Sequence, residues 1–67
     1  MSASYKKLWK LLIDRDLKKK DLQKLAGISN YTVSKLNGGD NVTTDILGKI
    51  CKALDCGVDD IMEFVDE

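Results

Sequence analysis

The chain has 67 residues, which fits a single domain of residues 1–67 and leaves little volume for a core plus a deep pocket. It has no histidine and only two cysteines, so a four-ligand zinc site cannot be assembled and the usual acid–base side chain is lacking. We therefore expect no enzyme activity, cofactor, metal site or small-molecule ligand. Apolar runs fall far below the ~18 residues that cross a bilayer, and no signal peptide is apparent, so we expect a soluble, cytoplasmic domain without a membrane partner.

Charge is divided unevenly along the chain, although the net charge is zero. From Met1 to Leu36, nine basic residues outnumber three acidic ones, which gives a net charge of +6. From Asn37 onward, eight acidic residues outnumber two basic ones, which gives a net charge of −6. Such asymmetry favours contact with nucleic acid. The alternative is that the lysines only solvate the outer faces of helices.

The first expected helix covers residues 5–14, with Ser4 as its N-cap. Its apolar residues recur at three- and four-residue spacing and form one stripe: Tyr5, Leu8, Trp9, Leu12 and Ile13. We interpret Trp9 as a core residue, the alternative being an exposed contact.

Two short helices are expected over residues 19–26 and 30–36. Gly27 is expected to end the first in the left-handed conformation, and Ser29 to cap the second. A three- to four-residue turn that contains glycine makes two such helices cross at roughly 90–120°. The residues expected to face the core are Leu22, Leu25, Ala26, Ile28, Val33 and Leu36.

A fourth helix is expected over residues 44–54, capped by Thr43 or Thr44, after the turn-rich stretch 37–41. Its apolar face comprises Ile46, Leu47, Ile50, Cys51 and Leu54. A fifth helix is expected over residues 60–65, with the apolar residues Ile61, Met62, Phe64 and Val65. No segment alternates with period two over a useful length, so the sequence predicts an all-α fold of five short helices.

The helix expected over residues 30–36 has a polar outer face: Asn30, Tyr31, Ser34 and Lys35. Asparagine can form two hydrogen bonds with adenine, lysine can donate to guanine, and serine and tyrosine can bond bases or phosphates. The alternative is an ordinary solvated face. Because Gly27 and Ser29 lie at the corner of the two helices, we favour a surface that contacts DNA bases.

One spacing runs through the two helices and their turn: Leu22, Gly27-Ile28-Ser29, Thr32-Val33 and Leu36-Asn37-Gly38. A second signature follows at the end of the fourth helix, Ala53-Leu54-Asp55-Cys56-Gly57-Val58, before the short final segment. Together these motifs resemble the lambda-repressor/Cro-like helix-turn-helix domain (the XRE family), over about residues 5–65.

This resemblance implies that the helix over residues 30–36 enters the major groove of duplex DNA. The implied base contacts are Ser29, Asn30, Tyr31, Ser34 and Lys35. The implied phosphate contacts are Lys18, Lys19, Lys20, Asn37 and Gly38. The chain departs from the family pattern at Lys18 and Lys19, where a capping Ser or Thr and then Gln are usual. It also departs at Gln23 in place of Ala, and at Asn37 in place of a Glu that pairs with the first helix.

We therefore expect a sequence-specific transcriptional regulator, a small repressor-type protein of bacterial, phage or mobile-element origin, with double-stranded DNA as its partner. The expected assembly is a weak two-fold homodimer, formed free or only on DNA, through Ile61, Phe64 and Val65. The alternative function is a protein-interaction module, antitoxin-like or adaptor, with the same helical fold.

Cys51 and Cys56 lie five residues apart and match no C-x-x-C motif. Cys51 falls on the apolar face of the fourth expected helix, where a free cysteine behaves as a small hydrophobe. We interpret both as buried, reduced thiols. A redox switch and half of a metal site are the alternatives.

Overall fold

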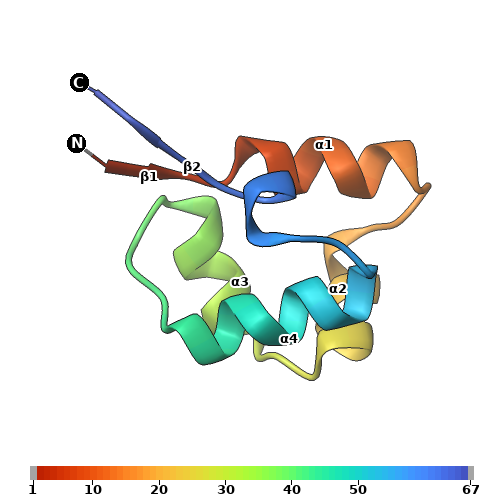
Figure 1. Ribbon diagram of the computed structural model, residues 1–67. Coiled ribbons are helices and arrows are strands. Elements are labelled where there is room, and N and C mark those ends of the chain that lie inside the picture. Colours follow the sequence, from red (N-terminus) through yellow and green to blue (C-terminus); the bar gives the residue numbers. More distant parts are fainter. Residues whose placement is uncertain (1, 67) are drawn as a thin grey trace.

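The computed structural model describes residues 2–66, which contain four α-helices, a short 3-10 helix and two strands (Figure 1). In chain order the elements are β1 (Ser2–Ser4), α1 (Lys6–Asp14), α2 (Lys19–Ala26), α3 (Asn30–Asn37), α4 (Thr44–Leu54), η1 (Val58–Asp60) and β2 (Glu63–Val65). Each α-helix begins and ends within one residue of its expected range. No helix within residues 2–66 is long and apolar enough to span a membrane.

The prediction of a fifth helix over residues 60–65 is wrong, and the fold is mostly helical rather than all-α. The segment instead forms η1 and then β2, which pairs antiparallel with β1 (Figure 1). The paired residues are Ser2 with Val65, Ala3 with Phe64, and Ser4 with Glu63. Strands of three residues are too short to show a period-two pattern, and their partners lie at opposite ends of the chain. The local sequence therefore contains no signal for this pairing.

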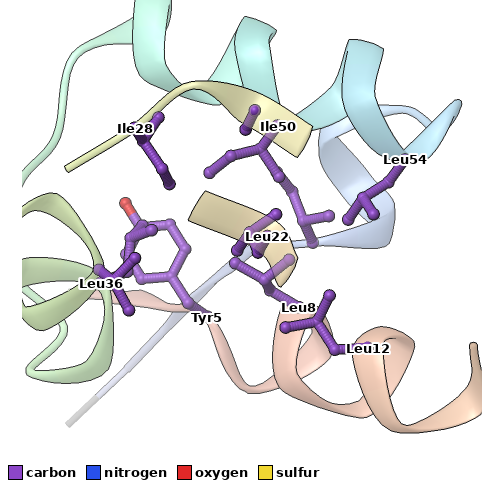
Figure 2. Close-up of a cluster of buried hydrophobic side chains, with 11 residues drawn as sticks. Tyr5, Leu8, Leu12, Leu22, Ile28, Leu36, Ile50 and Leu54 are labelled. Carbon is purple, nitrogen blue, oxygen red and sulfur yellow. The ribbon is translucent and has the colours of Figure 1, made fainter. Parts of the chain in front are cut away.

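The hydrophobic core is built from two buried residues of each α-helix, together with three residues from the connections. Figure 2 shows Leu22 of α2 between Leu8 of α1 and Ile50 of α4. Burying one such side chain stabilises the fold by about 1.5–3 kcal/mol, so this cluster holds the helices together. The complete cluster is Tyr5, Leu8, Leu12, Leu22, Ala26, Ile28, Val33, Leu36, Ile50, Leu54 and Ile61.

Two residues expected to face the core are exposed: Ile13 at 75% and Leu25 at 55%. Successive helical positions are rotated by about 100°, so Ile13 points away from the side on which its neighbour Leu12 is buried. In α2, Leu22 and Ala26 are the buried pair one turn apart, and Leu25 falls on the flank of that stripe. Burial also raises the pKa of the Tyr5 phenol above its usual value of about 10.

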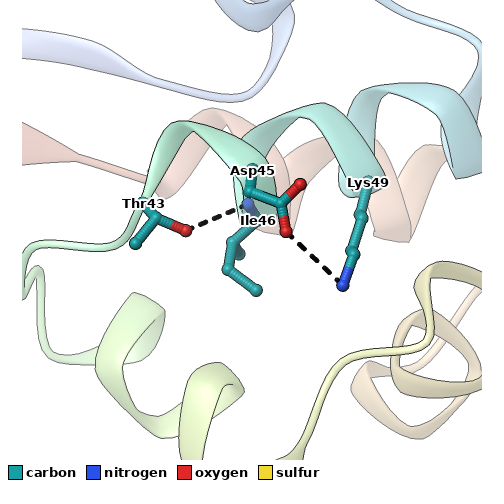
Figure 3. A network of polar contacts seen from close by, with 4 residues as sticks. All are labelled: Thr43, Asp45, Ile46 and Lys49. Atoms are coloured by element: carbon teal, nitrogen blue, oxygen red, sulfur yellow. Dashed lines mark hydrogen bonds and ion pairs between the residues drawn. The ribbon is translucent and has the colours of Figure 1, made fainter.

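The helix caps are formed mostly by local side chains. Thr43 caps α4, because its Oγ1 accepts a hydrogen bond from the backbone N of Ile46 at 3.3 Å (Figure 3). Asp45 and Lys49, one turn apart on the same helix, form an ion pair of 3.6 Å (Figure 3). The expectation for Ser4 is wrong, since Tyr5 occupies the N-cap position of α1.

Gly48→Ala and Gly27→Ala are expected to change stability in opposite directions, although both glycines are exposed and a Cβ at either meets no neighbouring atom within 4 Å. Gly48 lies inside α4, where alanine is favoured over glycine by about 0.8–1 kcal/mol. Gly27 has a φ of +67°, and this left-handed conformation costs alanine about 1–2 kcal/mol. Urea denaturation followed by circular dichroism measures both changes. Shifts of the same sign would contradict this backbone assignment.

Candidate nucleic-acid interface

A tight corner joins α2 to α3. Gly27 is left-handed, with φ 67° and ψ 37°, and its N–H donates to the Gln23 carbonyl at 2.9 Å. Ile28 is buried directly after it. Ser29 then caps α3, because its Oγ accepts from the backbone N of Thr32 at 3.1 Å and lies 3.0 Å from the Thr32 Oγ1. The predicted turn between α2 and α3 is therefore present, with a left-handed Gly27 and a capping Ser29, and the Ser29 hydroxyl already has a structural role within it.

The other expected base contacts lie on the outer face of α3. Asn30 and Ser34 are exposed, and Tyr31 is 71% exposed despite its large ring. Lys35 is half-buried, with its Nζ 5.5 Å from the centroid of the Tyr31 ring. A cation at this distance is attracted to the face of an aromatic ring, which holds the two side chains together. The face thus offers amide, hydroxyl and ammonium groups on one rigid helix.

The structure brings the two groups of expected phosphate contacts together. Lys18, Lys19 and Lys20 are exposed at the start of α2, and Asn37 and Gly38 are exposed at the end of α3. The Lys19 Nζ donates to the Asn37 Oδ1 at 2.8 Å, which joins the beginning of α2 to the end of α3. This contact connects residues far apart in sequence, so the spacing of the motif does not reveal it.

The Lys19 ammonium has a second partner, since it lies 4.5 Å from the centroid of the Trp9 ring on α1. Trp9 is half-buried and packs against the core, as interpreted from the sequence, while its ring also supports this lysine. Asn37 stands where the family pattern has a glutamate that pairs with the first helix, and here it bonds to α2 instead.

Residues 7–67 match the family model of the Cro/C1-type helix-turn-helix DNA-binding domain. The chain belongs to this family. The resemblance seen in its motifs is thereby confirmed. A crystal structure of the transcriptional regulator VanUg is similar over 98% of this chain and 88% of that one, with 47% sequence identity and a TM-score of 0.93. A comparison with curated protein sequences gives no match.

A cleft of about 370 Å³ lies beside α3 in this Cro/C1-type domain, and sequence reasoning missed it. One wall contains Tyr31 and Lys35, both of which are also expected base contacts. The opposite wall comes from the loop before α4 and from the first turn of that helix. Because the loop and α3 meet only in the folded chain, no local pattern indicates the cleft. Its lining is Tyr31, Thr32, Lys35, Asn41, Val42, Thr43 and Ile46.

The three residues expected at the dimer interface differ in their exposure to solvent in this Cro/C1-type domain. Ile61 is completely buried in the core, so its side chain has no surface to offer a partner. Phe64 is 66% exposed on β2, and Val65, next to it, is half-buried. The fifth helix on which this surface was expected is absent from residues 2–66, and a strand takes its place.

Ser29→Ala is expected to destabilise the Cro/C1-type domain by about 1 kcal/mol, because it removes the hydroxyl that caps α3. Ser34→Ala is the matched control: Ser34 is exposed inside the same helix, where alanine is the better helix former. Thermal and urea denaturation without DNA measure both variants. An equal loss of stability in the Ser29→Ala and Ser34→Ala variants would show that the Ser29 cap does not stabilise the domain.

Proposed function

We propose that this chain is a small transcriptional regulator of the repressor type that binds a specific sequence in duplex DNA by placing α3 in the major groove. The observation that supports this proposal most directly is the exposed polar face of α3, which follows a tight turn after α2. The chain also belongs to a family of DNA-binding domains. The similar crystal structure is that of a transcriptional regulator, which supports the same role. Its site of action would be the cytoplasm of a bacterial cell, on chromosomal, phage or mobile-element DNA.

In this proposal the base contacts are Ser29, Asn30, Tyr31, Ser34 and Lys35. Asn30 is the best candidate for specific recognition, because an asparagine amide bonds both donor and acceptor atoms of adenine. Ser29 would contribute least to base recognition, since its Oγ already accepts a hydrogen bond from the backbone. Tyr31 and Lys35 would act as a unit through their ring contact.

The proposed phosphate contacts are Lys18, Lys19, Lys20, Asn37 and Gly38. The three lysines at the beginning of α2 lie at the positive end of the helix dipole. A positive charge there interacts unfavourably with the dipole, and a negative charge interacts favourably. Asp21 compensates in part, because its Oδ2 accepts from the backbone N of Lys18 at 2.8 Å. A DNA phosphate placed there would interact favourably with both the lysines and the helix end.

Asn30→Ala and Lys20→Ala are expected to weaken DNA binding in different ways. Loss of Asn30 should cost about 1–3 kcal/mol on the preferred site and much less on random DNA. Loss of Lys20 should weaken all duplexes about equally and lower the slope of log K against log[salt] by about one. Selection from a random duplex library supplies the site, and fluorescence anisotropy at several salt concentrations measures both effects.

Lys52→Ala is the control for these variants, because Lys52 is exposed in the last turn of α4, away from the proposed surface. Circular dichroism should show all three variants folded. If Asn30→Ala and Tyr31→Ala both leave discrimination between sites unchanged, α3 does not recognise bases. Capture of a specific protein partner, with no affinity for DNA in low salt, would then support an interaction module.

The proposed assembly is a weak homodimer formed on DNA, through the surface around Phe64 and Val65. Phe64 is a large exposed apolar residue on β2, which pairs with β1 in a two-stranded sheet within residues 2–66, and a two-fold partner would cover both the side chain and the sheet. Half-sites would then lie about 34 Å apart.

Phe64→Ser is expected to abolish cooperative binding to a palindromic site while affinity for one half-site stays the same. Val58→Ser is the matched control, since Val58 is an exposed apolar residue on the neighbouring η1. Analytical ultracentrifugation with and without the palindrome gives the number of chains bound. A single copy on the complete palindrome would rule out this dimer.

A further inference from the structure

The turn that ends α4 brings Cys51, on the helix, close to Cys56, just after it. Asp55 is left-handed, with a φ of 52°, and its N–H donates to the Lys52 carbonyl at 3.4 Å. The N–H of Cys56 donates to the Cys51 carbonyl at 3.0 Å. These two bonds define a Schellman motif, in which the side chains at the Cys51 and Cys56 positions contact each other. The motif is usually closed by apolar side chains, and here it is closed by two thiols.

Both thiols are free and half-buried. Burial raises the pKa of the Cys56 thiol above its usual value, and the neighbouring Cys51 and the Asp60 carboxylate of η1 raise it further. The Arg15 guanidinium acts in the opposite direction. Because the thiolate is the reactive form, this environment favours a reduced pair that reacts slowly at neutral pH.

We propose that Cys51 and Cys56 are a reversible modification site, a dithiol that a peroxide converts to an intramolecular disulfide. A disulfide requires α-carbons about 4.4–6.8 Å apart. The direct backbone hydrogen bond from the Cys56 N–H to the Cys51 carbonyl holds the two residues adjacent at the end of α4. The left-handed Asp55 makes this return of the chain possible.

The reaction balances with one molecule of hydrogen peroxide. One thiolate attacks a peroxide oxygen, the O–O bond breaks, and a sulfenic acid and one water are formed. The second sulfur then attacks the sulfenic sulfur, the S–S bond forms, the S–O bond breaks, and hydroxide leaves as a second water after it takes a proton. The two sulfurs lose two electrons in total, and a dithiol reductant restores them.

The disulfide is expected to constrain the C-terminal end of α4. The same helix end is already fixed to α1, because the Arg15 guanidinium donates to the Leu54 carbonyl. The cleft beside α3 is lined by the opposite end of α4, at Thr43 and Ile46. Oxidation should therefore raise the melting temperature and leave the surface of α3 unchanged.

To test this proposal, the full chain is treated with hydrogen peroxide and its peptides are mapped by mass spectrometry. We expect a Cys51–Cys56 cross-link with the loss of two hydrogen atoms, a melting temperature higher by about 5–10 °C, and full reversal by dithiothreitol. Phenylarsine oxide, which bridges paired thiols, should bind the reduced chain one to one. Oxidation should accelerate as the pH rises toward the pKa of the Cys56 thiol.

Cys51→Ser, Cys56→Ser and the double variant are the controls, and none of them should show a rise in melting temperature on oxidation. Disulfide-linked dimers, sulfinic acids on separate cysteines, or unreacted thiols in the wild-type chain would each overturn the proposal. The peptide map of the wild-type chain and its binding ratio to phenylarsine oxide test the proposal even if a serine variant does not fold.

Discussion

The packing of Leu22 against α1 and α4 is the contact on which the rest of the structure depends (Figure 2). The short helix α2 buries only Leu22 and Ala26, and apart from the exposed Leu25 the remainder of its surface carries polar residues. Because α3 follows a tight corner, the position of α2 on the core also fixes the direction of α3 and its exposed face. A change at Leu22 would thus disturb the proposed DNA-binding face of α3, although Leu22 itself is completely buried.

Features set by neighbouring residues could be predicted from the sequence. The apolar stripes, the Ser29 cap and the left-handed Gly27 depend on a few consecutive residues, and the four α-helices lie where these signals put them. Features set by residues far apart could not. The strand pair and the bond between Lys19 and Asn37 form only when the chain has folded. The contact roles assigned to individual side chains stay predictions.

The separation of charge along the sequence is only partly kept in the fold. Most basic residues lie on α1 and at the beginning of α2, and the acidic residues gather after α4, on η1 and the segments around it. However, α4 itself carries two lysines and one aspartate, and η1 lies beside α1, where the Lys7 Nζ donates to the Asp59 carbonyl. The exposed lysines at the beginning of α2 give this neutral protein a local positive surface, and such a surface attracts a polyanion. At higher ionic strength this attraction weakens, since the Debye length falls to about 10 Å at 0.1 M salt.

The pairing of β1 with β2 has a consequence for the order in which the domain folds. Ser2–Ser4 and Glu63–Val65 are separated by nearly the whole described chain, so their pairing closes the largest loop available and costs the most chain entropy. The helices, by contrast, form from local contacts and fold early. We infer that the strand pair closes last, on helices that have already docked. It would also open first, as a local event that leaves the core around Leu22 intact.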